Sequence, residues 1–190
     1  LFPYTTLFRS EINSYRIMNE IYELSNQNIN FSKAISEIYN VRDEYIKLAR
    51  EDETAAFILK ENKQYKHSIY FFIQAMEKYI RAKIFSKISP ENEYFRDLNK
   101  HHSIETSGAF LLDIYCVDHN VKNQIKIMFE AAVFGDIQFN RLHNNLRYPF
   151  YNQNRKTFLS CYYEKEDCEL IELKLQNLKQ FLNDLDKLLY

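Results

Sequence analysis

Residues 65–85 read YKHSIYFFIQAMEKYIRAKIF, and the organisation of the rest of the chain follows from them. Five apolar side chains recur at intervals of four, three, four and four residues: Ile69, Ile73, Met76, Ile80 and Ile84. This spacing is typical of a helix that buries one side. Four more residues widen the apolar stripe: Phe72, Ala75, Tyr79 and Ala82. We therefore predict a central helix that other helices contact on more than one side.

Two charged residues interrupt this apolar stripe. Glu77 and Lys78 lie within it, where removing an unpaired charge from water is costly. We expect each side chain to be paired with a neighbour or to stand where a ligand reaches it.

The preceding helix has an acidic residue on its apolar face. We expect this helix to begin at Val41 and to end at the polar turn 61–64, so that it forms an antiparallel hairpin with the central helix. Asp52 stands where an apolar residue is expected. It is either a structural partner of Lys78 or Arg81, or a carboxylate of a binding site.

Two further seams of apolar residues lie in the C-terminal half. The first runs from Val121 to Leu146 without a miss, which predicts one helix that ends before Pro149. Gly135 falls on its buried face, so we expect another helix to approach closely there. The second seam predicts a closing helix from near Lys165 to the terminus. Residues 157–163 form either a short strand or a helical turn.

Composition limits the class of protein. The chain has 190 residues with a net charge of −1, and 46% of its residues are hydrophobic, so it is neither a disordered chain nor a membrane-embedded one. It contains two glycines and three prolines, which argues against a turn-rich β protein. We predict an all-α, up-down helical bundle of four to five main helices, formed by residues 41–190.

The N-terminal part of the sequence is assigned separately. Residues 1–10, LFPYTTLFRS, read as the translation of a common sequencing adapter. We expect them to be an adapter-derived scar from assembly or cloning, and we exclude them from the fold. Residues 11–40 predict an N-terminal helical extension. If the first residues are a scar, the natural N-terminus and any targeting segment are not in this sequence.

Cysteines and histidines give little sign of a metal or cofactor. The three cysteines form no C-x-x-C motif, and we expect reduced thiols in a cytoplasmic protein. The five histidines lack the spacing of a zinc or di-iron site. We expect no metal and no cofactor.

The order of landmarks along the chain resembles that of the HEPN family, small all-helical domains of bacteria and archaea with relatives in eukaryotes. The similarity is strongest over Leu48–Phe85 and extends over roughly residues 42–190. The residues that carry it are Asp52, Ala55, Ala56, Tyr65, Ala75, Glu77, Lys78, Ala82, His101 and the tripeptide Arg147-Tyr148-Pro149. The resemblance implies a HEPN-like bundle that occurs in toxin–antitoxin pairs with a nucleotidyltransferase partner, or in antiphage abortive infection.

The resemblance also implies a form of catalysis. HEPN ribonucleases cleave RNA without a metal in a dimer cleft. Their motif is an Arg, a polar residue, three to five further residues and a His; the Arg steadies the phosphate and the His moves a proton. Arg96 and His101 fit the letters of that motif but lie earlier than the family places it. Arg141 and His143 lie in the right region, two residues apart, and could pair only across a dimer. These four are our candidate catalytic residues.

A second set of polar residues is a candidate binding site. His143, Asn144 and Arg147 share one helix face and suit a phosphate or a nucleotide edge. We add Tyr148, Asp52, Glu77 and Lys78 as ligand-binding candidates. The function we favour is a HEPN-domain module that binds nucleotide or RNA, acts as a homodimer and does not contact a membrane. The alternatives are an active metal-independent endoribonuclease and a non-catalytic scaffold that dimerises through the Val121 and Ile171 helices.

Overall fold

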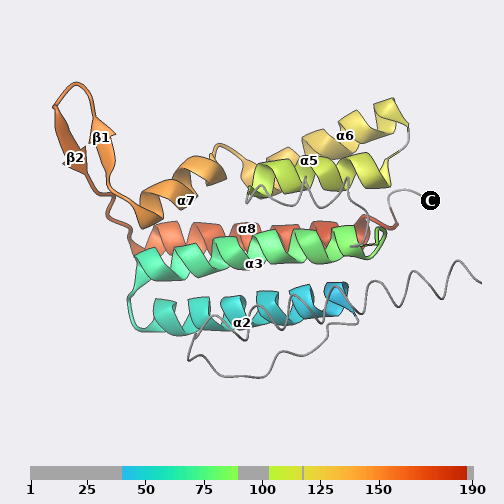
Figure 1. The fold of residues 1–190 in the computed structure, drawn as a ribbon, viewed down its shortest axis with the longest axis horizontal. Helices are drawn as coiled ribbons and strands as arrows, with labels where there is room; N and C mark the ends of the chain where they lie inside the picture. The colour runs from blue at the N-terminus through green and yellow to red at the C-terminus, as the bar shows by residue number, and fades with distance from the viewer. Residues whose placement is uncertain (1–39, 90–102, 117, 188–190) are drawn as a thin grey trace, which may run out of the picture. The chain divides into compact units, whose positions relative to one another are not determined.

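The computed structural model describes residues 40–89, 103–116 and 118–187, and residues 40–190 belong to one compact unit. In chain order the described elements of this unit are α2 (Val41–Glu61), α3 (Tyr65–Phe85), α5 (Ile104–Tyr115), α6 (His119–Phe129), a π-helical turn η1 (Glu130–Phe134), α7 (Phe139–Arg147), β1 (Phe150–Asn152), β2 (Thr157–Leu159) and α8 (Lys165–Asp184). The fold is an all-α helical bundle, as predicted, with one small β-hairpin (Figure 1).

Helices α2 and α3 form the predicted antiparallel hairpin. The Asn40 side chain accepts a hydrogen bond from the Asp43 backbone N–H and so caps the start of α2. Lys63 adopts a positive φ of 59° in the turn between the two helices. The turn therefore lies within the polar segment 61–64 where the sequence predicts it.

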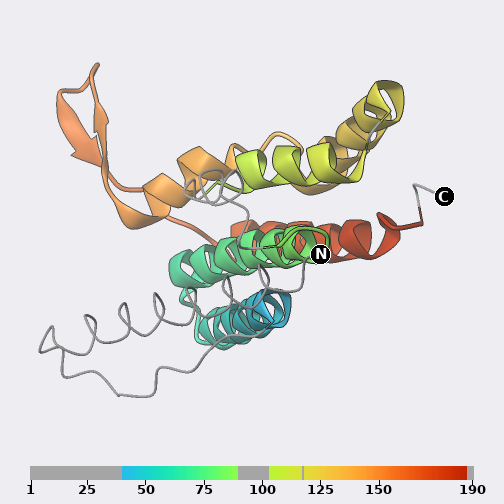
Figure 2. The ribbon, with the colours of Figure 1, turned by 45° about the vertical axis from the view of Figure 1, so that its right-hand side comes forward.

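Helix α3 is the central element of the unit. All five isoleucine and methionine residues of its predicted stripe are buried. It packs against α2, α5, α7 and α8. Figures 1 and 2 show α2 on one side of α3 and helices α5 to α7 on the other, with α8 running beside it. The prediction of a helix that is contacted on several sides is confirmed.

Helices α5 and α6 meet at a point of very close approach. Ser103 caps α5 by accepting a hydrogen bond from the Thr106 backbone N–H. Gly108 lies in the middle of α5, and a Cβ added there would stand 2.5 Å from Cε1 of Phe129, the last residue of α6. The absence of a side chain at residue 108 thus lets the aromatic ring lie against the backbone of α5.

The prediction of one helix from Val121 to the residue before Pro149 is wrong. The chain leaves α-helical geometry in η1 and then turns at Gly135, whose φ of 56° is readily adopted only by glycine. Gly135 is exposed, and a Cβ added there would meet the end of the Lys174 side chain of α8, at 3.1 Å from Nζ, rather than the backbone of another helix. Val121 is also exposed, at 38%, because α6 buries Ile125 and Phe129 in its place. The helix does end where predicted, since Tyr148 before Pro149 is extended.

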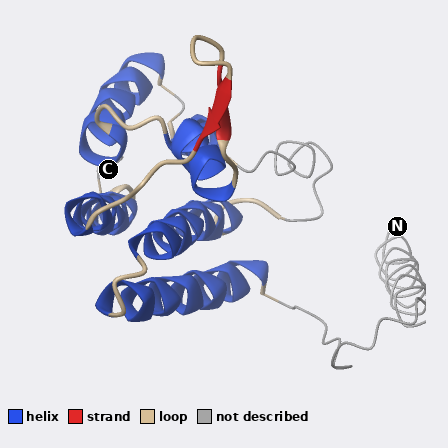
Figure 3. Cartoon of the chain, turned by 90° about the vertical axis from the view of Figure 1, so that its left-hand side faces the viewer, coloured by secondary structure: helices blue, strands red, loops and turns tan. Residues whose placement is uncertain are grey.

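Of the two structures predicted for residues 157–163, a short strand or a helical turn, the strand is present, as β2. β1 and β2 pair in antiparallel fashion, with Phe150 opposite Leu159 and Tyr151 opposite Phe158. Successive side chains of a strand point to opposite faces, and Tyr151 and Phe158 lie on the exposed face of this hairpin. Their ring centroids are 5.3 Å apart. Figure 1 shows the two strands projecting away from the helices of the unit, and Figure 3 shows the same strands in red.

Helix α8 closes the unit and covers α3. Its side chain seam of Ile171, Leu175, Leu178 and Leu182 is buried, as predicted. The helix begins at Lys165, as predicted, with a reciprocal capping arrangement between Glu164 and Asp167, and it ends at Asp184 rather than at the terminus. Among the described helices of residues 40–187, none combines the length and the apolar character of a membrane span.

Candidate functional site

Asp52 and Lys78 are brought together, as one of the two interpretations of Asp52 predicts. The Lys78 ammonium group donates a hydrogen bond to the Asp52 carboxylate across the α2–α3 contact. The Asp52 side chain is 14% exposed and that of Lys78 is 25% exposed. This pair therefore satisfies both charges within the bundle and joins the two helices.

Glu77 is paired with a different residue from Lys78. The Arg81 guanidinium donates to the Glu77 carboxylate through Nε at 3.0 Å and lies within 2.8 Å of it through Nη2. Both side chains are less than one-tenth exposed. The two adjacent charges on α3 thus point to different neighbours, and the burial of the second pair satisfies the expectation that charges in this stripe are paired.

Helix α7 separates Arg141 from His143. The His143 ring lies against α3, where it stacks on Tyr70 with a centroid distance of 5.4 Å and hydrogen bonds to Gln74 at 3.0 Å. Arg141 instead lines a cavity of about 520 Å³ between α7, α8 and the residues just after β2. Within one chain the two candidate catalytic side chains therefore do not converge on one point.

The remaining residues of the α7 cluster lie at the surface. Asn144 is exposed, and Arg147 places its guanidinium 4.9 Å from the centroid of the Tyr148 ring. Arg147 Nη2 also donates a hydrogen bond to the Tyr148 hydroxyl at 2.9 Å. These three residues are open to solvent, unlike His143. The other two candidates, Arg96 and His101, lie outside the described residues.

The segment 137–163 is chemically distinct from the rest of the chain. It carries Arg141, Arg147, Arg155 and Lys156 and contains no Asp or Glu, although the whole chain has a net charge of −1. It also exposes large aromatic side chains: Tyr148 is 55% exposed, Tyr151 52%, Phe158 67% and Tyr162 96%. We call the residues that α7 and the β-hairpin expose here the hairpin surface: Arg147, Tyr148, Tyr151, Arg155, Lys156 and Phe158.

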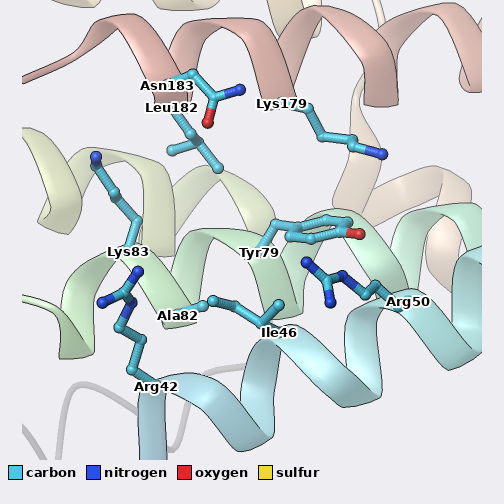
Figure 4. Close-up of a pocket in the computed structure, with 9 residues that line it drawn as sticks. All are labelled: Arg42, Ile46, Arg50, Tyr79, Ala82, Lys83, Lys179, Leu182 and Asn183. Atoms are coloured by element: carbon cyan, nitrogen blue, oxygen red, sulfur yellow. The ribbon is translucent and has the colours of Figure 1, made fainter.

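Sequence reasoning missed a second basic site. A cavity of about 350 Å³ lies between α2, α3 and α8 and is lined by four cationic side chains, Arg42, Arg50, Lys83 and Lys179 (Figure 4). Burial, followed by the hydrogen bond to Glu53, raises the pKa of Tyr79 in its wall above the usual value. The signal in the sequence is weak, because each helix contributes only one or two cations and each cation is an ordinary surface residue.

Metal-ligating and nucleophilic groups do not gather at either basic site. Within the described ranges, no three His, Cys, Asp or Glu side chains are placed to hold a metal. Cys116 and Cys168 are buried free thiols, and burial raises the pKa of each. Comparison of the chain with protein-family models, with curated proteins and with solved structures finds no match.

Proposed function

We propose that this chain is a HEPN-like module that binds single-stranded RNA or nucleotide through the hairpin surface. The observation that carries the proposal is the segment 137–163, which combines four cations, no acids and several exposed aromatic rings. Cations bind the phosphate backbone, and aromatic rings stack on unpaired bases. Protein surfaces that bind single-stranded nucleic acid use this combination.

The arrangement of the rings and cations favours a surface that binds RNA over one that only keeps the protein in solution. Tyr151 and Phe158 are held side by side by the strand register, so the hairpin offers a preformed pair of rings. Arg155 and Lys156 lie in the turn between those strands, and Arg147 lies at the end of α7. When the bases of a single-stranded RNA stack on these rings, the three cations lie near enough to bind its phosphates.

The family resemblance suggests the biological context. The proposal rests on the residues that carry the resemblance, of which Asp52, Glu77 and Lys78 lie on the paired helices α2 and α3 of an all-α fold. We propose a role in a prokaryotic toxin–antitoxin or antiphage system, with a nucleotidyltransferase as one candidate partner. Because Arg141 and His143 do not converge within one chain, cleavage by this pair would require a dimer, whereas binding at the hairpin surface does not.

Fluorescence anisotropy with a labelled single-stranded RNA of about 12 nucleotides tests the proposal, since OB folds, which also bind single strands by stacking and charge, cover about 4–16 nucleotides. We expect Phe158→Ala to weaken binding about ten-fold or more, because stacking of one base contributes about 1–3 kcal/mol. We expect Arg155→Gln to weaken binding and to reduce the slope of log affinity against log salt by about 0.7.

Two control variants remove similar groups from other surfaces. Leu173→Ala removes a 55%-exposed apolar side chain from α8, and Lys126→Gln removes a half-exposed cation from α6. Both should bind RNA like the wild type. Equal affinities for Phe158→Ala, Arg155→Gln and the controls would refute the role of the hairpin surface. Incubation with total RNA and a chelator separates this proposal from the endoribonuclease alternative, which requires cleavage products.

A further inference from the structure

The cavity between α2, α3 and α8 has a basic group at each end and an apolar floor. Arg42 and Lys83 lie at one end, while Arg50 and Lys179 lie at the other (Figure 4). The floor between them comes from Ile46, Ala82, Leu182 and the ring of Tyr79. Among the described residues that line the cavity, none carries a carboxylate.

The charges at the two ends are only partly compensated. Lys83 lies 2.7 Å from Asp186, and Lys179 lies 2.8 Å from Glu53. Among the described residues, the ion pair of Arg42 is a long one of 4.0 Å to the adjacent and exposed Asp43. Within the part of the chain that the structure describes, no ion pair involves Arg50. Each end therefore keeps one arginine that can still bind an anion.

Arg50 and Tyr79 define one end of the cavity more closely. The Arg50 guanidinium reaches from α2 toward the ring of Tyr79, and the Lys179 ammonium group lies 5.4 Å from the centroid of the same ring (Figure 4). The Tyr79 hydroxyl donates a hydrogen bond to Glu53 at 2.8 Å, and Glu53 also accepts from Lys179. This network fixes the positions of the Tyr79 ring and the Lys179 ammonium group. An anion bound by Arg50 therefore meets side chains that are already in place.

The separation of the two ends indicates two anions rather than one. Arg42 and Arg50 are eight residues apart on α2, which corresponds to about 12 Å along the helix axis. The Debye length at physiological ionic strength is about 8 Å, so each end attracts its own anion. Arginine is the residue best suited to a phosphate, because its planar guanidinium donates two parallel hydrogen bonds.

We propose that this cavity binds a small bisphosphate, with one phosphate on Arg42 and Lys83, the other on Arg50 and Lys179, and the body of the ligand on the apolar floor. The volume of about 350 Å³ lies at the lower end of the range for small-molecule sites. An apolar floor favours a ligand with a planar or apolar body. The site is separate from the hairpin surface and does not depend on its function.

Isothermal titration calorimetry with four probes tests the proposal. Adenosine 3′,5′-bisphosphate and fructose 1,6-bisphosphate carry two separated phosphates, AMP carries one, and inorganic pyrophosphate carries two adjacent ones. We expect the nucleoside bisphosphate to bind at least ten-fold more tightly than AMP or pyrophosphate. Equal binding of the two bisphosphates would support the two-ended site and assign no role to the base, whereas AMP or pyrophosphate binding as tightly would overturn it.

Variants of the two arginines complete the test. Arg42→Gln and Arg50→Gln should each weaken bisphosphate binding about ten-fold, since a hydrogen bond to a charged group contributes roughly 1.5–3 kcal/mol. AMP should respond to only one of the two substitutions. Both arginine side chains are exposed, so the fold should survive, and Lys126→Gln on α6, a half-exposed cation outside both proposed sites, is the matched control. The proposal is overturned if both variants bind like the wild type, or if no bisphosphate binds at millimolar concentration.

Discussion

Replacing Gly108 with alanine tests the close approach of α5 and α6. The added Cβ would lie 2.5 Å from Cε1 and 2.9 Å from Cζ of Phe129, whereas ordinary contacts begin near 3.4 Å. The ring is 1% exposed and packs on Phe134 and Phe181, with centroid distances of 5.0 and 4.8 Å. It therefore has little room to move away.

The size of the effect follows from two opposing contributions. Overpacking a core costs about 1–3 kcal/mol, and the confined ring places this site in the upper part of that range. Alanine recovers up to about 1 kcal/mol through its higher helix propensity. We expect Gly108→Ala to lower the free energy of unfolding by about 1–2 kcal/mol, and Tm by about 2–8 °C for a chain of this length.

Urea unfolding followed by far-UV circular dichroism measures the loss. Ala109→Gly, at the exposed neighbouring position, reports helix propensity alone and should cost about 1 kcal/mol. In a Phe129→Leu background the ring edge is absent, so Gly108→Ala should become neutral or stabilising. If Gly108→Ala is as stable as the wild type while Phe129 is present, the close approach of the two helices is refuted.

Three other substitutions or conditions probe the buried polar groups. Ser68→Ala should cost about 1 kcal/mol in urea unfolding, because the buried hydroxyl donates to a backbone carbonyl of α2 at 2.7 Å. Lys78→Met should cost about 1–2 kcal/mol by the same assay, between the values for exposed and buried pairs, since it leaves the Asp52 carboxylate without its lysine. Burial raises the pKa of Cys116 and of Cys168, so the unfolded chain loses these protons at lower pH than the folded chain does. The free energy of unfolding should therefore fall as pH rises above about 8.5, and a double cysteine-to-alanine variant should show a flatter profile between pH 7.5 and 9.5.

Periodicity located the elements whose geometry is local. The stripe of α3 and the seam of α8 are buried as predicted, because a regular helix carries the spacing of its apolar residues directly into its buried face. The pairing of Asp52 with Lys78 was also one of the predicted outcomes, since a charge on an apolar face needs a partner on the adjoining helix.

The spacing of apolar residues does not reveal a break in a helix when the same spacing continues on both sides of the break. The seam from Val121 to Leu146 continues across η1 and Gly135, although the backbone changes direction there. A glycine on an apolar stripe is compatible with a close helix contact or with a turn. The structure places the close contact at Gly108 and the turn at Gly135.

The basic cavity depends on tertiary arrangement and could not be predicted from the sequence. Its cations come from positions near residues 42–50, 79–83 and 179–183, which come together only when α2, α3 and α8 are packed. By contrast, the hairpin surface comes from one continuous segment without acids, so charge pattern alone can indicate it. The exposure of its aromatic rings still required the register of β1 and β2.

The central position of α3 has a consequence for how this protein could change over evolution. A substitution on a helix that touches four others disturbs several interfaces at once, so α3 should tolerate the fewest replacements. New specificities would therefore arise by drift on α2, α7, α8 and the hairpin, each of which has exposed side chains. In a saturation-mutagenesis library scored by cellular abundance, substitutions over Tyr65–Phe85 should lower abundance more often than substitutions in the flanking segments.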